Sequence, residues 1–255
     1  MNRPYALTLD AAQSPIRNVP RRSPVKAGPP FAFTLVELLV VIAVIAVLAA
    51  LVMPVYNLVA KNSVIQRAQS EEKTLETAIG LYHDKYGFYP PGNTNATPAN
   101  LAAALTNQLY YELVGTTIFA GSSAGSNFVT LDGASSNSTA VVQKYFGVGG
   151  YMNCSRGSGD DAIKAQTFLP GLKSGQMATN SDGVCVIVTG ASSDAIYKPM
   201  PGFQTSVGNA NPWRYLYPGV NNPNSYDLWV QIFVGGKTNL ICNWKDQPQY
   251  NSPLP

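Results

Sequence analysis

One carboxylate stands inside a long apolar stretch, and its chemistry raises the first question about this chain. From Phe33 to Met53 every residue is apolar except Thr34 and Glu37. As a helix, this stretch would be about 30 Å long, which matches the hydrocarbon core of a bilayer. An ionisable group inside a membrane span is costly and usually has a partner. Because the stretch contains no base, the sequence predicts that another chain brings a positive charge to Glu37. The alternative is a stray acid tolerated near the membrane surface.

Basic residues predominate before this stretch, and acids slightly outnumber them after it. Residues 1–32 contain five bases and one acid, namely Arg3, Arg17, Arg21, Arg22, Lys26 and Asp10. The whole chain carries +3 and this leader carries +4, so residues 33–255 carry a net −1. Bases before an apolar span keep that end in the cytoplasm, which predicts an exported C-terminal body. That body lacks the basic footprint of a nucleic-acid-binding protein.

Other reactive residues form no catalytic pattern. The only histidine, His83, falls where a helix is predicted to end, and its partial charge suits the helix dipole there. A Ser-His-Asp arrangement would have to be built around this histidine, and the sequence has no P-loop or G-x-G-x-x-G. Its cysteines, Cys154, Cys185 and Cys242, lack zinc-ligand spacing, although an oxidising compartment would allow one disulfide whose pairing stays open. We therefore expect no enzyme and no metal.

A second helical pattern follows the apolar stretch. Apolar residues recur at three- and four-residue steps between charged ones: Val64, Ile65, Ala68, Leu75, Ala78, Ile79, Tyr82 and Tyr86. This spacing predicts an amphipathic helix over 55–86, with its end near His83–Lys85, ahead of Gly87 and a Pro-Pro-Gly turn.

The remaining residues give shorter signals. A second helix is predicted from Pro98 to Leu113, and loops are predicted over Gly121–Asn127 and Ala134–Thr139. The run Val184–Val188 predicts a buried strand. Nearer the C-terminus, residues 211–219 and 225–230 predict a strand, a turn and a strand.

The start of the apolar stretch resembles a known signal. Phe33-Thr34-Leu35-Val36-Glu37-Leu38-Leu39-Val40 is similar to the class III signal of type IV pilins and type II secretion pseudopilins. The resemblance implies that a prepilin peptidase cleaves between Ala32 and Phe33, where the family usually has Gly before the cut, and methylates the amine of Phe33. It also implies that Glu37 pairs with the N-terminal amine of a neighbouring subunit, and that Pro54 kinks or loosens the helix.

Two later stretches extend this resemblance. Tyr86-Gly87-Phe88-Tyr89-Pro90 resembles the family's junction between long helix and head, and residues 211–230 resemble the end of major pseudopilins. In that family a following loop can bind calcium, but Val234–Asn239 contains no acid. Calcium prefers carboxylate oxygens, so no cofactor is expected. Asp227 and Asp246 are the only nearby acids that calcium could use.

Together these features predict an α+β, pilin-like fold. A long N-terminal helix, half transmembrane and half amphipathic, would pack on a small antiparallel sheet. The expected segments are a removed leader (1–32), a transmembrane half (33–54), an amphipathic half (55–86), a variable, loop-rich insert (87–205) and C-terminal strands (206–255).

The implied function is structural. The chain would be a pseudopilin in an inner-membrane-anchored filament of a bacterial type II secretion system, with its N-terminus cytoplasmic and its head periplasmic. Its partners would be the prepilin peptidase, identical and related subunits, the assembly platform protein and its ATPase, and the membrane, but not nucleic acid. The alternatives are a type IV pilin for adhesion, motility or DNA uptake, and an exported binding protein or enzyme anchored by a pilin signal.

Overall fold

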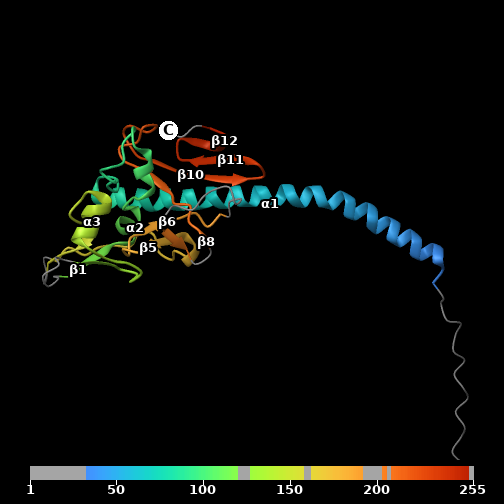
Figure 1. The fold of residues 1–255 in the computed structure, drawn as a ribbon, viewed down its shortest axis with the longest axis horizontal. Coiled ribbons are helices and arrows are strands. Elements are labelled where there is room, and N and C mark those ends of the chain that lie inside the picture. The colour runs from blue at the N-terminus through green and yellow to red at the C-terminus, as the bar shows by residue number, and fades with distance from the viewer. Residues whose placement is uncertain (1–32, 120–126, 158–161, 192–202, 206–207, 253–255) are drawn as a thin grey trace, which may run out of the picture. The chain divides into compact units, whose positions relative to one another are not determined.

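The fold contains helices and mainly antiparallel sheets. The computed structural model describes residues 33–119, 127–157, 162–191, 203–205 and 208–252. It divides into two compact units, Met1–Leu51 and Val52–Pro255, and the helix α1 (Leu35–Tyr86) belongs to both (Figure 1). The mixed α+β class is as predicted. The leader, including Ala32, lies outside the described residues.

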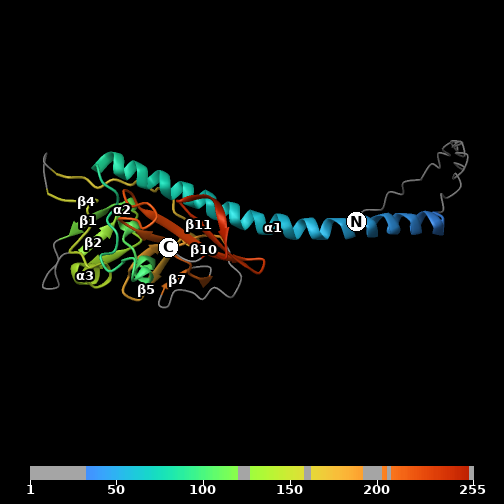
Figure 2. The same cartoon turned by 90° about the horizontal axis from the view of Figure 1, so that it is seen from above.

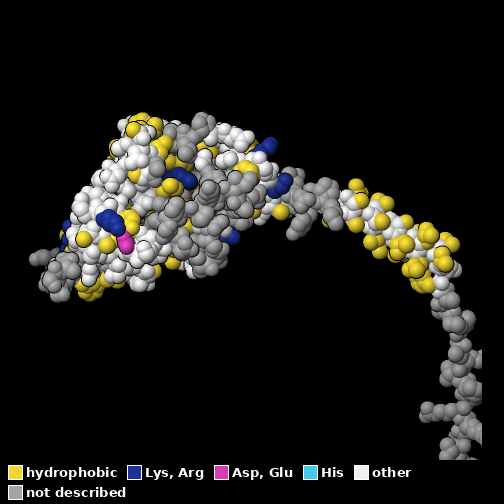
Figure 3. Space-filling view, in the orientation of Figure 1, with side chains coloured by type: hydrophobic (Ala, Val, Ile, Leu, Met, Phe, Trp, Pro, Cys, Tyr) yellow, Lys and Arg dark blue, Asp and Glu magenta, His cyan; other side chains and the backbone are white. Residues whose placement is uncertain are grey.

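The first part of α1 is apolar on every side. Residues Leu35–Val52 are long and apolar enough to cross a membrane, and none of this stretch is buried by the protein itself. Hydrophobic side chains cover its visible surface (Figure 3). The backbone of α1 stays helical through Pro54, whose side chain lies outside the described set. Proline removes only one backbone donor, so a long helix can accommodate it when other contacts hold the chain.

The later part of α1 buries one stripe, as its periodicity predicts. The buried members are Ala68, Leu75, Ala78, Ile79 and Tyr82. The helix ends at Tyr86, one residue beyond the predicted end. Gly87 then adopts a positive φ of 77° and donates from its backbone N–H to the carbonyl of His83 at 2.7 Å. This left-handed residue closes the helix because glycine has no Cβ to clash.

The C-terminal sheet lies along this part of α1 (Figure 2). Its strands are β9 (Arg214–Leu216), β10 (Asp227–Val234), β11 (Lys237–Cys242) and β12 (Lys245–Tyr250), in the order β12-β11-β10-β9. All its pairings are antiparallel. The predicted strand, turn and strand are therefore present, and β11 and β12 complete the sheet.

The segment 234–239 is a tight hairpin rather than a loop. Val234 pairs with Lys237, so only Gly235 and Gly236 form the turn, with φ of 63° and 81°. Two successive left-handed residues are what a type I′ turn requires. The acid-free segment is thus a two-residue turn between β10 and β11.

The region 87–205 contains short helices and strands separated by loops. Its first half holds η1 (Leu101–Leu105), α2 (Leu109–Val114), β1 (Thr116–Phe119), β2 (Asn127–Thr130), β3 (Ser136–Ser138), α3 (Thr139–Phe146) and β4 (Cys154–Ser155). The sheet order is β3-β2-β1-β4, with β1 and β4 parallel. The single helix predicted from Pro98 to Leu113 is thus two short helices. The segment predicted as a loop over Ala134–Thr139 contains β3.

A third sheet follows in the order β6-β5-β7-β8. Its elements are η2 (Ser174–Gln176), β5 (Met177–Asn180), β6 (Cys185–Ile187), β7 (Phe203–Thr205) and β8 (Gly208–Asn209). The buried strand predicted at Val184–Val188 is confirmed by β6. The three cysteines are buried and free, and each belongs to a different sheet.

A buried carboxylate joins α1 to the middle region. Glu112 is fully buried and accepts from the backbone N–H groups of Met152 and Asn153, both at 2.9 Å. It also accepts from the hydroxyl of Tyr82, on α1, at 3.0 Å. Burial raises the pKa of Glu112, while these donors favour its charged form. Because an unsatisfied buried acceptor is costly, the three bonds fix how α1 and α2 pack.

Glu72, one turn before Leu75 on α1, is a contrasting buried acid. It is only 4% exposed, and its Oε1 has no hydrogen-bond partner among the described residues. Burial, reinforced by the nearby charge of Glu76, raises the pKa of Glu72 to about 7. Its carboxyl group is therefore easier to bury when it is protonated.

Candidate assembly site at the start of the first helix

Glu37 has a partner inside its own chain, which corrects the expectation that the stretch supplies none. The backbone N–H of Thr34 donates to Glu37 Oε2 at 2.8 Å, and the Thr34 hydroxyl donates to the same oxygen at 2.9 Å. In return, the backbone N–H of Glu37 donates to Thr34 Oγ1 at 3.2 Å. These reciprocal bonds form a capping box, whose T-x-x-E signature is readable in the sequence.

The cap explains how the acid is held. The first amides of a helix have no intrahelical acceptor, and their partial positive charge favours an anion in the first turn. Both bonds from Thr34 reach Oε2, whereas Glu37 Oε1 has no hydrogen bond within the described part of the chain. The side chain is exposed. One carboxylate oxygen is thus oriented by the cap and the other is open to an incoming donor.

The structure brings two of the predicted site residues together and leaves two untested. Phe33 directly precedes the capping Thr34 and is 77% exposed, so its backbone lies within one helical turn of Glu37. Ala32 and the peptide bond predicted to be cut lie at the edge of the described residues. Pro54 lies within the continuous helix, and a kink there stays a prediction.

Asp227 serves a role that the sequence does not reveal. Its side chain is fully buried, and Oδ2 accepts from the backbone N–H groups of Val220 and Asn221, both at 2.8 Å. Oδ1 accepts from the backbone N–H of Asn222 at 3.0 Å. Donors that point at both oxygens would repel a cation, so Asp227 anchors this loop.

Asp246 does not complete a metal site with it in the described residues. Asp246 is exposed on β12. Within the described ranges, no group of three His, Cys, Asp or Glu side chains is placed to hold a metal ion. Calcium binding therefore gains no support from either candidate.

His83 lies in the last turn of α1, as its position in the sequence predicts. Its ring packs against the ring of Tyr89, with 4.4 Å between centroids. Its Nδ1 is 3.9 Å from Asp84 Oδ1, a contact that becomes an ion pair only when the ring is protonated. These contacts suit a residue that ends a helix.

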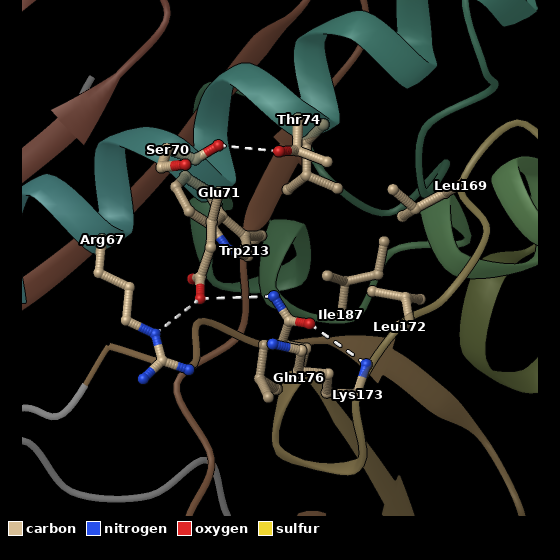
Figure 4. Close-up of a pocket in the computed structure, with 12 residues that line it drawn as sticks. Arg67, Ser70, Glu71, Thr74, Leu169, Leu172, Lys173, Gln176, Ile187 and Trp213 are labelled. Atoms are coloured by element: carbon tan, nitrogen blue, oxygen red, sulfur yellow. Dashed lines mark hydrogen bonds and ion pairs between the residues drawn. The ribbon is translucent and has the colours of Figure 1, made fainter.

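A separate pocket opens beside α1 in the head (Figure 4). The carboxylate of Glu71 organises its polar end: it accepts from the hydroxyl of Thr189 at 2.7 Å and from the backbone N–H of Gly190 at 3.0 Å. Arg67 and Gln176 also donate to it, at 3.3 and 3.4 Å. A Cβ at position 190 would lie 2.5 Å from the Arg67 guanidinium, so glycine permits this close approach. The sequence gives no signal for this pocket, since its residues are far apart in the chain.

Comparisons with known proteins assign this chain to no family. No protein-family model matches the chain, and neither the curated proteins nor the solved structures contain a match.

Proposed function

We propose that this chain is a pseudopilin, a structural subunit of an inner-membrane-anchored filament of a type II secretion system. The observation that carries the proposal is the start of α1. There, a capped acid with one open oxygen stands at the head of a helix whose apolar surface is exposed on all sides. The basic leader and the resemblance of Phe33–Val40 to the class III signal add support.

In this proposal the membrane and sister subunits cover α1 in turn. The apolar residues of Leu35–Val52 would first lie in lipid and then pack against the same segment of other subunits. Lipid tails are as apolar as these side chains, so packing rather than the hydrophobic effect would favour association. An assembly platform protein and its ATPase would move subunits from the membrane into the filament.

Glu37 would select the position of each new subunit. Prepilin peptidase would cut before Phe33 and methylate the amine that the cut exposes. The amine of the arriving subunit would then meet the open Oε1 of Glu37 on its neighbour. A charge-assisted hydrogen bond is stronger than a neutral one, and more so away from water. Pairing would also remove the cost of leaving both charges in an apolar surrounding.

Processing gives the first test. Intact mass spectrometry of the chain from its host membrane should show loss of residues 1–32 and addition of one methyl group at Phe33. Replacing Ala32 with Glu should leave the full-length precursor, because a bulky charge would block the peptidase. An Ala32→Ser control should be processed. An uncut wild-type chain would contradict the proposed maturation.

Location gives the second test. The wild-type chain should appear in filaments sheared from cells that also express the assembly machinery. Glu37→Val should insert into the membrane and be absent from the sheared fraction. A wild-type chain confined to membranes would favour the anchored binding protein or enzyme instead. Loss of secretion, rather than of adhesion or motility, on deletion would separate the pseudopilin from a type IV pilin.

A further inference from the structure

The pocket beside α1 has an apolar floor of substantial size. Its volume is about 390 Å³, room for roughly a dozen waters at about 30 Å³ each. The floor is made by Leu75, Leu169, Leu172, Ile187 and Trp213, of which only Leu172 is not fully buried. Most known ligand-binding pockets combine such a floor with a few polar groups at one end. This pocket therefore suits an occupant with an apolar body.

The polar end of the pocket attracts an anion. Arg67 and Lys173 both line it (Figure 4). Glu71 is the acid there, and four groups already donate to it. Arg67 uses its Nε for Glu71, and in the described part of the chain neither Arg67 Nη1 and Nη2 nor Lys173 Nζ has another acid as a partner. Arg67 and Lys173 together outnumber the Glu71 carboxylate by one positive charge.

A matching surface lies at the far end of the same helix. Leu81 is 51% exposed on a helix whose other large apolar side chains in the head half are mostly packed. The Asp84 side chain is 81% exposed, and its closest charged neighbour is His83 at 3.9 Å. Residues three apart on a helix share a face, so Leu81 and Asp84 present an apolar group beside an acid. We call this pair the α1 knob.

The knob cannot reach the pocket of its own chain. Leu75 lines the pocket and Leu81 belongs to the knob, and both are on α1. Leu75 is the lining residue of α1 nearest to Leu81 in the chain, and six residues correspond to about 9 Å along a helix, a separation that the rigid helix holds fixed. The knob can therefore occupy this pocket only on a second molecule.

We propose that the α1 knob of one copy docks into the pocket of a second copy, with Leu81 on the apolar floor and Asp84 at Arg67 and Lys173. Exposed ion pairs contribute little by themselves, so burial of Leu81 supplies most of the attraction and Asp84 fixes the orientation. Knob and pocket are different patches, which makes the contact heterologous. A bound pair keeps one free knob on one copy and one free pocket on the other, so the contact can repeat into a ring or filament. The proposal rests on the proposed function, because a repeating contact serves a subunit that polymerises.

Cysteine cross-linking in membranes from cells producing the full chain tests the contact. The double variant Lys85→Cys/Ser174→Cys places exposed cysteines beside the knob and beside Lys173 and keeps Leu81. It should give a ladder of multimers with a short bis-maleimide, because the three native cysteines are buried. A mixture of the two single variants should stop at dimers. The matched control is Asn62→Cys/Ser174→Cys, since Asn62 is exposed on α1 about 34 Å from Lys85 along the helix. It should give no ladder.

A charge reversal tests the orientation. Asp84→Lys in the double-cysteine chain should reduce the ladder at least fivefold, whereas Lys61→Glu, at an exposed position of α1 far from the knob, should leave it unchanged. Dimers from Lys85→Cys alone, or an equal ladder from the Asn62→Cys control, would overturn the heterologous contact. Sheared filaments without the ladder would also overturn it while leaving the proposed function intact. A ladder without sheared filaments would keep the contact and contradict the proposed function.

Discussion

The two parts of α1 are continuous in sequence and opposite in how their apolar residues are covered. In the segment Leu35–Val52 the large apolar side chains are exposed around the whole helix. In the segment 64–86 they form one stripe, and the head of the same chain buries it. One helix therefore carries two interaction patterns. In the head half, most large apolar side chains are covered by the rest of the same chain. The apolar side chains of Leu35–Val52 can be covered only by lipid or by other helices.

The acids of the two parts differ in the same way. In the head, the carboxylates of Glu71 and Glu112 accept hydrogen bonds on both oxygens or from several donors of the same chain. At the start of α1, the cap holds Glu37 and leaves Oε1 open. The contrast suggests that the open oxygen belongs to intermolecular chemistry and that the head carboxylates belong to folding. Glu72, whose buried Oε1 has no hydrogen-bond partner among the described residues, is the exception that tests this division.

Matched isoleucine truncations should show the largest difference between the two parts. Ile79 is fully buried and Ile45 is 58% exposed. Ile79→Ala should lower the free energy of unfolding of the head by about 2–5 kcal/mol, because it leaves a cavity. Ile45→Ala should change it by less than about 0.5 kcal/mol. Denaturant unfolding of the full chain in detergent, followed by tryptophan fluorescence, measures both. Equal losses of unfolding free energy in the two variants would contradict the proposed difference between the two parts of α1.

The next effect is the pH dependence contributed by Glu72. Its pKa is about 7 in the folded chain, compared with 4.5 for an ordinary glutamate. Between these values the folded state binds more protons, so the free energy of unfolding should fall as pH rises from 5 to 7 and level off above that. The contribution is on the order of 3 kcal/mol from this difference. Unfolding curves at pH 5, 6, 7 and 8 measure it.

Glu72→Gln should remove this part of the slope and make the head more stable than wild type at pH 8. Asp84→Asn is the matched control, because the Asp84 side chain is 81% exposed on the same helix. If the wild type and Glu72→Gln lose stability in parallel between pH 5 and 7, the buried acid is not the cause.

The smallest effect concerns the cap. Thr34→Val removes the hydroxyl that accepts from the Glu37 backbone, and should weaken the first turn of α1 by about 1 kcal/mol. Hydrogen exchange at the first amides of α1 should become faster, with no change in the head. Thr34→Ser, which keeps the hydroxyl, should behave as wild type. Unaltered exchange in Thr34→Val would show that the cap does not order the helix start.

Periodicity made the helix and its stripe predictable, and local signals made the strands at Val184–Val188 and 225–230 predictable. The strand β3 was not, because Ser136-Asn137-Ser138 has no strand-forming side chain and depends on pairing with β2. The buried roles of Glu112 and Asp227 also depend on backbone donors that tertiary folding brings to them. At the candidate site, the position of Glu37 was readable from the sequence, and so was its cap in the T-x-x-E signature.

The amount of Glu37→Gln chain in sheared filaments tests the central claim most directly. Glutamine can replace glutamate in a capping box, so this variant keeps the helix start and removes only the charge. We predict that Glu37→Gln is inserted and processed like wild type but is missing from sheared filaments, as is Glu37→Val. Filaments of Glu37→Gln in wild-type amounts would show that Glu37 serves the cap alone, and would contradict charge pairing between subunits.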